Sequence, residues 1–445
     1  MKRVITYGTY DLLHYGHINL LKRAKALGDY LIVGITADDF DKSRGKINVQ
    51  QSLIERIEAV RNTGIADEII VEEYEGQKID DIIKYNIDIF TVGSDWVGHF
   101  DYLNDYCEVV YLPRTEGVSS SEIRSEVSTL RLGFVGDTEF LEKVLTECKM
   151  VNGLEPKAIY SSNYSVLPKS LDSIELKTNN FDELLYYVDA VYIRSKPEEH
   201  FEQIKTAIIN NKHVLCESPI TINVEEWNEL QSLAEEHNVV LMDAIKTAFA
   251  TAYSRLLLQL KGGAIGTVVS VDATCTSLID DSYNEYDWDN IHEWGPTALL
   301  PIFQLLGTDY EKHEIVAQFR DDDQLHDSFV KMNFVYPNAV ASLKIGNGVK
   351  SEGELVVSGT MGYAYVPAPW WKPDYYEFRF ENHNDNKRYF YPLEGEGIRY
   401  ELLAFLKAIH NGRTAWDISK NVSKSIVTIM EEFKDQKSIT IISRA

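Results

Sequence analysis

An alternation of strand-like and helix-like segments at the start of the chain limits the possible folds more than any other feature. Five short apolar runs predict strands, and helical patterns of apolar residues lie between them. These runs are residues 3–7, 30–36, 68–72, 88–93 and 108–112. Strands that alternate with helices form a parallel sheet, because each helix returns the chain to the starting edge of the next strand. The sequence therefore predicts a parallel-sheet α/β domain over residues 1–128.

A second alternating series follows at once and predicts a second doubly wound α/β domain over residues 129–248. Its strand-like runs are residues 130–136, 157–160, 190–193, 213–216 and 239–242. Near residue 249 the pattern changes to a long helix followed by strand-like stretches, at residues 266–275, 328–346, 354–366 and 376–391. Consecutive strands without helices between them favour an antiparallel sheet. We expect an α+β domain with a mainly antiparallel sheet over residues 249–445, closed by a helical tail.

The composition fits a protein of several domains and excludes some classes of partner. At 445 residues the chain exceeds the usual size of a single core. Its net charge of -25 opposes a general nucleic-acid binder, because nucleic acids are held by extended basic surfaces. The cysteines are scattered without CxxC spacing, which fits a reducing compartment and opposes structural zinc. No N-terminal signal or bilayer-length apolar run is visible, so we expect a cytoplasmic protein without a membrane span.

The turn after the first predicted strand carries two histidines at the start of a helical pattern. His14 and His17 flank Gly16, and apolar residues recur at helical spacing behind them. A helix N-terminus attracts phosphate through its unpaired backbone N–H groups and the positive end of its dipole. Gly8 and Gly16 have no side chain that would hold a phosphate away. The turn therefore predicts a nucleoside triphosphate site, while a metal pair or a capped surface turn stays open at this point.

A second segment narrows this choice. The strand-like run 109–112 leads into residues 113–121, which read PRTEGVSSS, and a helical pattern begins at Glu122. The two segments resemble the HxGH and RTxGIS(T/S) motifs of the cytidylyltransferases, most closely those of the glycerol-3-phosphate cytidylyltransferases. The resemblance covers residues 1 to about 128 and implies a Rossmann-like HxGH nucleotidyltransferase domain.

The resemblance also implies which residues bind CTP and assist the reaction. Contacts with CTP fall on Gly8, Thr9, Tyr10, His14, His17, Arg114, Thr115, Ser119 and Ser120. Catalytic or transition-state roles fall on His14, His17 and Lys46. Close relatives have a lysine where Arg44 stands and an arginine where Gly64 stands. Arg61, one helical turn before Gly64, could replace the lost charge, or the chain could use a different phospho-alcohol.

Nucleotidyl transfer joins two anions, so its site must supply cations and preorganised donors. Arg44 and Lys46 lie on a polar loop after the second predicted strand, and Arg114 and Arg124 flank the serine-rich turn. Each of them taken alone could be a solvated surface charge. Their position at strand ends favours a binding role, because ligands of open parallel sheets bind outside the carboxyl ends of the strands.

Three further residues are candidates for the acceptor and the metal. Asp95 could contact the ribose or the acceptor alcohol, and a solvated loop aspartate is the alternative. Arg56 is a candidate for binding the phosphate-bearing substrate. Asp11 belongs to the predicted nucleotide site and could help to hold Mg²⁺, which prefers phosphate oxygens and few protein ligands.

The second half carries a different resemblance. Residues 211–245 resemble the Gfo/Idh/MocA oxidoreductases around their Glu-Lys-Pro motif, and the likeness extends roughly over residues 130–445. The catalytic lysine of that family falls on Ser218, which cannot supply a positive charge. Of the dinucleotide fingerprint G-x-G-x-x-(G/A) only Gly136 stands in place, and the carboxylate of Asp137 follows it where pyrophosphate would bind. NAD(P) is therefore not favoured as a cofactor.

We therefore expect an enzyme that transfers CMP from CTP to glycerol 3-phosphate or a related polyol phosphate, with Mg²⁺ as cofactor. The second half would be noncatalytic and would bind a ligand or partner, dimerise or regulate the transferase. The alternative is a bifunctional enzyme whose second half is an NAD(P)-dependent oxidoreductase that makes the phospho-alcohol. A lesser alternative is an adenylyltransferase of the same superfamily. The resemblance also implies a homodimer and a product for teichoic-acid or capsule assembly.

Overall fold

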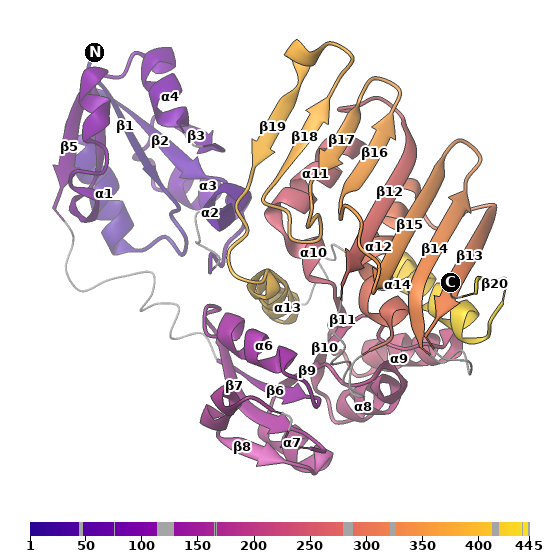
Figure 1. Cartoon of the computed structure of the whole chain (residues 1–445). Helices are drawn as coiled ribbons and strands as arrows, with labels where there is room; N and C mark the ends of the chain where they lie inside the picture. Colours follow the sequence, from indigo (N-terminus) through magenta and orange to yellow (C-terminus); the bar gives the residue numbers. More distant parts are fainter. Residues whose placement is uncertain are drawn as a thin grey trace. The chain divides into compact units, whose positions relative to one another are not determined.

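A computed structural model describes the chain from Met1 to Ala445 apart from residues 44–47, 75, 114–128, 164, 166, 279–287, 321–325, 412–417, 438 and 444–445. The chain divides into two compact units, Met1–Thr129 and Leu130–Ala445 (Figure 1). Each unit is described by itself below. The finer division at residues 248 and 249 stays a prediction, because the second unit contains both of the sheets that follow residue 129.

The first unit is built on one parallel sheet of five strands. In chain order they are β1 (Arg3–Gly8), β2 (Tyr30–Thr36), β3 (Glu68–Glu72), β4 (Ile89–Gly93) and β5 (Glu108–Leu112). The helices described between them are α1 (Tyr15–Lys25), α2 (Asp38–Ser43), α3 (Leu53–Asn62) and α4 (Gln77–Tyr85). The spatial order is β3-β2-β1-β4-β5, which confirms the predicted parallel α/β sheet. The winding reverses between β1 and β4, so ligands are expected outside the carboxyl ends of these two strands.

Apolar residues cover both faces of this sheet, as a sheet enclosed by helices requires. On one face Val4, Leu31 and Val33 pack with Leu21 of α1 in a buried cluster. On the other face Ile5, Ile32 and Phe90 form a second cluster with Ile82 of α4. Adjacent residues of one strand point to opposite faces, so both clusters come from the same apolar runs.

The second unit starts with a parallel sheet of six strands. They are β6 (Leu130–Val135), β7 (Leu154–Tyr160), β8 (Leu176–Thr178), β9 (Ala190–Ile193), β10 (His213–Glu217) and β11 (Leu241–Ala244). Their spatial order is β11-β10-β9-β6-β7-β8, the doubly wound order, with the winding reversed between β6 and β9. The helices described here are α6 (Phe140–Cys148), α7 (Phe181–Tyr187), α8 (Pro197–Ile209) and α9 (Val224–Glu236). All strands expected from the sequence are confirmed, and the three-residue β8 was not predicted.

A nine-stranded mixed sheet follows, in the order β19-β18-β17-β16-β12-β15-β14-β13-β20. Its strands are β12 (Val268–Ser277), β13 (Lys312–Phe319), β14 (Asp327–Val335), β15 (Val340–Asn347), β16 (Leu355–Gly359), β17 (Tyr363–Val366), β18 (Tyr375–Arg379), β19 (Lys387–Phe390) and β20 (Ile439–Ile441). Only the β12–β15 and β13–β20 pairs among these strands are parallel, so the expected mainly antiparallel sheet is confirmed. The predicted helical tail is incomplete, because the chain continues past its helices into β20 at the sheet edge.

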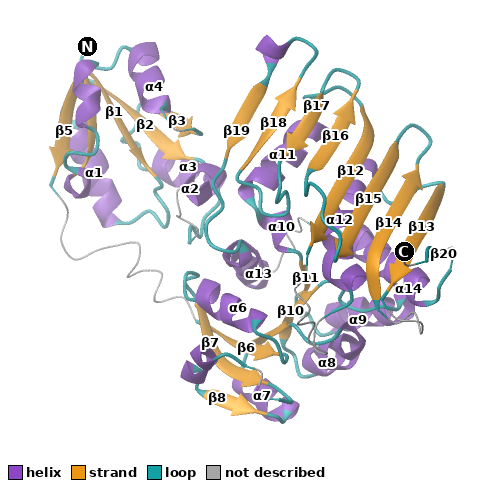
Figure 2. Cartoon of the chain, viewed as in Figure 1, coloured by secondary structure: helices purple, strands orange, loops and turns teal. Residues whose placement is uncertain are grey.

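Helices pack on the nine-stranded sheet and join it to the parallel sheet. They are α10 (Lys246–Phe249), α11 (Thr251–Lys261), α12 (Asn290–Leu306), α13 (Ile398–Asn411) and α14 (Lys420–Lys434). The long helix α12 packs against β12 and β15, and Figure 2 shows it along one face of the sheet. α14 contacts both α12 and α9, so it links the two layers of this unit. None of the described helices has the length and apolar character needed to cross a membrane.

Candidate active site

Two histidines cap the first helix of the first unit. His14 is the N-cap of α1, with an extended backbone, and its Nδ1 accepts a hydrogen bond of 3.1 Å from the backbone N–H of Gly16. Nδ1 of His17 accepts one of 3.5 Å from the backbone N–H of His14. This is the reciprocal capping box, with imidazoles in place of the usual hydroxyl and carboxylate. Because each Nδ1 accepts a hydrogen bond, the proton of each imidazole lies on Nε2, where it can be donated.

The same turn holds residues in a costly backbone conformation. Tyr10 and Leu12 have φ angles of 53° and 48°, in the left-handed region that side chains other than glycine disfavour. The buried ring of Tyr10 lies edge-on to His17, with 5.6 Å between ring centroids. A Cβ atom on Gly8 would lie 3.0 Å from the Tyr10 ring, so Gly8 makes room for this tyrosine. Packing around Tyr10 therefore shapes the turn.

A cavity of about 500 Å³ opens beside this turn, at the carboxyl ends of β1 and β4. It brings together predicted site residues from separate parts of the chain, namely Gly8, Thr9, Tyr10, Asp11, His17 and Asp95. Its volume lies in the usual range for small-molecule sites, roughly 300–1,000 Å³. Trp96 and Asn48 also line it, and the sequence analysis assigned no role to Asn48. The cavity therefore opens where the histidine-capped helix begins.

Asp11 fixes a neighbouring loop within this site. Its buried carboxylate accepts hydrogen bonds from the backbone N–H groups of Gln50, at 3.0 and 3.1 Å, and of Gln51, at 2.9 Å. These bonds hold the segment that leads into α3 against the β1–α1 turn. Within the described residues, no group of three or more histidine, cysteine, aspartate or glutamate residues could hold a metal ion. Mg²⁺ binding at Asp11 stays a prediction, and it would depend mainly on nucleotide phosphates.

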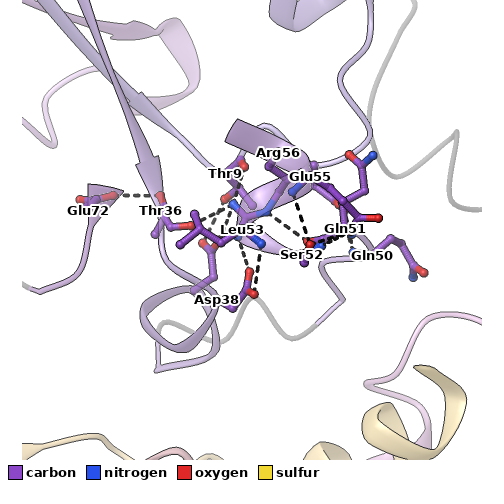
Figure 3. A network of polar contacts seen from close by, with 12 residues as sticks. Thr9, Thr36, Asp38, Gln50, Gln51, Ser52, Leu53, Glu55, Arg56 and Glu72 are labelled. Atoms are coloured by element: carbon purple, nitrogen blue, oxygen red, sulfur yellow. Dashed lines mark hydrogen bonds and ion pairs between the residues drawn. The ribbon is translucent and has the colours of Figure 1, made fainter. Parts of the chain in front are cut away.

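The side chain of Arg56 is fully buried. Figure 3 shows its contacts with the turn, β2 and the start of α3. Its guanidinium donates to the backbone carbonyl oxygens of Thr9 at 2.6 Å, Thr36 at 2.9 Å and Gln51 at 3.2 Å. It also forms an ion pair with Asp38. This placement favours a positioning role: Arg56 holds the turn, β2 and the start of α3 together. Direct contact between Arg56 and a substrate stays a prediction.

A residue missed by the sequence analysis completes this support. Gln51 accepts a hydrogen bond of 2.8 Å from the backbone N–H of Leu12 through its side-chain oxygen. Together with Asp11 and Arg56 it ties the strained turn to residues 50–56. Strained residues persist only where the surrounding structure over-determines them, and these contacts supply that constraint. A polar residue before a helix gives no sequence signal for a contact with a turn so far away in the chain.

Several predicted site residues lie outside the described part of the chain. They are Arg44, Lys46, Arg114, Thr115, Ser119, Ser120 and Arg124. Their roles in binding CTP and in catalysis stay predictions. Gly64, where relatives have an arginine, is described and has a φ of 67°, a conformation in which an arginine would be strained.

In the second unit, the turn after β6 corresponds to the position of a dinucleotide fingerprint. Gly136 has a φ of 141°, and a Cβ atom there would lie 2.2 Å from the carbonyl oxygen of Arg194. This glycine is therefore required by the close approach of the strand ends. The carboxylate of Asp137 accepts hydrogen bonds from the hydroxyls of Ser161 and Ser162 and from the backbone N–H of Asn163. Asp137 thus fills the end of β7, where the ribose of a dinucleotide would need an acceptor.

Arg194 occupies the switch point between β6 and β9 itself. Its guanidinium carbon lies 3.7 Å from the centroid of the Trp288 ring and 5.3 Å from that of Phe140, and it pairs with Glu293. The cavity beside it measures about 160 Å³, well below the size of a site for a small molecule. Burial, followed by the charge of Asp137, raises the pKa of Glu199 in the lining of this cavity. The residues present do not fit a dinucleotide, because side chains fill its place and carboxylates face its pyrophosphate.

The sheet order, the histidine-capped helix at the switch point and the cavity beside it define a nucleotidyltransferase of the HxGH type. The cytidylyltransferase-like family model matches residues 5–126. Glycerol-3-phosphate cytidylyltransferase from Bacillus subtilis (strain 168) is 52% identical over 130 residues, which are 29% of this chain and 100% of that protein. The chain therefore belongs to the cytidylyltransferase-like family.

The second half matches a different family, described as an oxidoreductase family with an NAD-binding Rossmann fold, over residues 130–244. The NADP(+)-dependent scyllo-inositol 2-dehydrogenase IolU from Bacillus subtilis is 44% identical over 80 residues, which are 18% of this chain and 24% of that protein. The solved structure of KijD10, a 3-ketoreductase from Actinomadura kijaniata, matches with a TM-score of 0.64 and 18% identity. That match covers 72% of this chain and 100% of KijD10. The second half thus has a Gfo/Idh/MocA-type oxidoreductase fold.

Proposed function

We propose that the first unit transfers CMP from CTP to glycerol 3-phosphate or a closely related polyol phosphate and releases pyrophosphate. The observation that carries the proposal is the pair of histidines capping α1, whose Nδ1 atoms are engaged by the backbone beside the cavity. The named function of a relative that is 52% identical over its whole length supports the choice of substrates. CTP and a polyol phosphate are therefore the partners that we assign to this site.

In the proposed reaction, a phosphate oxygen of the acceptor attacks the α-phosphorus of CTP. The bond from this phosphorus to the bridging oxygen of the β-phosphate breaks as the new bond forms, and pyrophosphate leaves with the electron pair. Negative charge grows on the oxygens around the α-phosphorus, so fixed donors there lower the barrier. We assign this role to the Nε2 protons of His14 and His17 and to the N-terminus of α1. Lys46 would add a positive charge.

Mg²⁺ would supply charge neutralisation on the triphosphate when bound. It would be held mainly by nucleotide oxygens, with Asp11 as the candidate protein ligand from the sequence. In the described structure the carboxylate of Asp11 is used by two backbone N–H groups, so we expect its main contribution to be the position of the loop before α3.

We propose that the second unit is noncatalytic. The filled switch point at Arg194 and the absence of a lysine at Ser218 support this over a bifunctional reductase. We further propose that the protein acts in the cytoplasm as a homodimer and that its CDP-alcohol serves teichoic-acid or capsule assembly. The homodimer and the use of the product rest on the family resemblance, and the cytoplasmic location rests on the scattered cysteines, which fit a reducing compartment.

The experiment for the first unit is an assay of pyrophosphate release with each nucleotide and each acceptor. We expect release with CTP and glycerol 3-phosphate, or with CTP and another polyol phosphate such as ribitol phosphate. Release with ATP and none with CTP would replace the proposal with an adenylyltransferase. No release with CTP and any polyol phosphate would contradict the proposed acceptor class.

A further inference from the structure

Three lysines of the second unit meet around one carboxylate. The Nζ atoms of Lys143, Lys246 and Lys372 lie 3.8, 4.0 and 2.5 Å from the same oxygen, Oε2 of Glu396. We call these four residues the lysine cluster. Lys143 belongs to α6, Lys246 begins α10, and Lys372 lies between β17 and β18, so segments far apart in the sequence converge here. All three lysine side chains keep some contact with solvent, with exposed fractions of 52%, 25% and 33%.

The cluster lies at the edge of the six-stranded sheet where ligands of such sheets bind. Lys246 follows the carboxyl end of β11, and Lys143 is on the helix that follows β6. The Nζ of Lys246 is 5.4 Å from the ring of Phe140, which also faces Arg194 at the switch point. Arg194 and Phe140 thus occupy the place where a dinucleotide would bind, and the lysine cluster lies beside them.

One carboxylate cannot neutralise three ammonium groups. Lys372 lowers the pKa of Glu396, so Glu396 is charged, and a surplus of positive charge is left among the three lysines. On its other side Lys246 faces Glu217 and Glu401, and burial lowers the pKa of Lys246 and raises the pKa of both carboxyls. Burial therefore favours the neutral form of all three groups, so the surplus of positive charge in the free protein rests on Lys143 and Lys372, which share the single carboxylate of Glu396. Such a surplus is unusual in a chain with a net charge of -25, and it suits an anion.

Turn geometry and packing hold the segments that carry Glu396 and Lys372 in place. Glu396 lies between Gly395 and Gly397, whose φ angles of 60° and 82° hold it in a tight turn before α13. Trp371 precedes Lys372 and packs edge-on against Trp294, with 4.9 Å between ring centroids. The hydroxyl of Thr247 donates to the carbonyl oxygen of Trp371 at 2.8 Å, which fixes this segment against α10. The half-buried Trp371 thus packs on Trp294 and anchors the segment that carries Lys372.

We propose that the lysine cluster binds a phosphate monoester, and that its ligand is a polyol phosphate of the class used by the first unit. The choice of the polyol rests on the proposed function, whereas the phosphate rests on the lysines alone. In the free protein the carboxylate of Glu396 supplies the negative charge that the phosphate would supply in the complex. Binding would set the dianionic phosphate against all three ammonium groups, which form charge-assisted hydrogen bonds with phosphate oxygens. The second unit would then be a ligand-binding module without redox chemistry.

The test is calorimetric titration of the full chain at low salt with glycerol 3-phosphate, inorganic phosphate and glycerol. We expect wild-type protein to bind glycerol 3-phosphate at a site additional to that of the first unit. Lys246→Met and Lys372→Met should each weaken this site by about tenfold or more, since each removes a hydrogen bond from a charged donor. Lys205→Met is the matched control, because Lys205 is a partly exposed lysine of the same unit that pairs with Glu229 at 2.7 Å. It should leave the titration unchanged.

The variant Glu396→Gln distinguishes a site that binds an anion from a cluster of ion pairs that only stabilises the fold. Removing the competing carboxylate should tighten phosphate binding if the proposal holds. Weaker or unchanged binding in Glu396→Gln, equal binding of glycerol, or an unchanged titration in the Lys246→Met/Lys372→Met double variant would overturn it. Inorganic phosphate that binds as well as glycerol 3-phosphate would overturn the polyol assignment. CMP transfer is assayed on the same samples. If wild-type protein transfers no CMP but still binds phosphate through the lysines, the proposed function is refuted and the phosphate site stands.

Discussion

The two units use the same kind of sheet and differ at the turn after the first strand. In the first unit this turn holds His14 and His17 at a helix N-terminus, under a cavity of about 500 Å³. In the second unit the corresponding turn holds Gly136 and Asp137, and Arg194 fills the neighbouring switch point. In the proposed function the first turn presents proton donors to an anion, whereas the turn of the second unit holds a carboxylate. The comparison teaches that a doubly wound sheet provides a place for a nucleotide, and that only the side chains at the turn make it a site.

The largest effect is expected at Arg56, the buried arginine that supports the β1–α1 turn of the first unit. Arg56→Met should destabilise the first unit by about 3–5 kcal/mol, because it removes the partner of two carbonyl groups and of the fully buried carboxylate of Asp41, which lies 3.9 Å from the guanidinium. Denaturant unfolding followed by hydrogen exchange of the first unit measures this loss. Turnover should fall as well, since the strained residues Tyr10 and Leu12 lose their support. A stable variant with wild-type turnover would contradict the positioning role of Arg56.

His17→Ala should lower turnover by about 10²–10³-fold, as expected when one donor to a developing anion is removed. The measurement is pyrophosphate release at saturating CTP. His17→Gln is the matched control for stability, because glutamine at this position can still accept from the backbone N–H of His14. We expect His17→Gln to unfold like wild type and to be as slow as His17→Ala. Near-normal rates in both variants would remove His17 from the catalytic set.

Lys46→Ala should reduce turnover by roughly 10²-fold through the loss of one fixed positive charge near the phosphates. Its thermal unfolding should match that of wild type. The same assay of pyrophosphate release tests it, with Lys205→Ala in the second unit as a charge-matched control. A rate equal to that of the control would remove Lys46 from the site.

A smaller effect is expected in the second unit, at the buried carboxyl of Asp243. Asp243 accepts a hydrogen bond of 3.1 Å from Ser218, the position where the oxidoreductase family has its lysine, and burial raises the pKa of Asp243 to about 6. The folded state therefore binds more protons than the unfolded state between pH 3.8, the ordinary pKa, and about 6. Stability from this group falls as the pH rises through that window.

Asp243→Asn removes this titration. We expect the substitution to stabilise the second unit at pH 7.5 by about 1–2 kcal/mol and to have little effect near pH 4, where the wild-type carboxyl is already neutral. Hydrogen exchange of the second unit at both pH values measures the difference. Equal effects at the two pH values would mean that Asp243 is compensated by a cation after all.

The sequence was sufficient for the sheets of both units, because parallel strands buried on both faces read as short apolar runs. It failed for β8 and β20, which have three residues each, for the eight-residue β13, and for α12, which contains two prolines. The motif residues of the β1–α1 turn were also predictable, since His14, His17 and the glycines carry local signals. The supports were not: Gln51 and Arg56 act through contacts across the fold, and an arginine gives no sequence sign that it is fully buried.

The missing dinucleotide site illustrates the same limit. The sequence indicated an incomplete fingerprint at Gly136, but it could not show that Arg194 stacks on Trp288, a residue far along the chain, at the switch point. The local sequence shows which residues of a dinucleotide fingerprint are missing. Which side chains occupy the site instead depends on how distant segments pack.

The most direct test of the account is to titrate one preparation of the full chain with CTP and with NADH or NADPH, following nucleotide binding by calorimetry and cofactor fluorescence. We predict saturable CTP binding that is weakened in His17→Ala, and no change in NADH or NADPH fluorescence at any protein concentration that saturates CTP. Tight binding of either reduced cofactor, or CTP binding that is indifferent to His17, would contradict the claim that only the first of the two nucleotide folds retains its site.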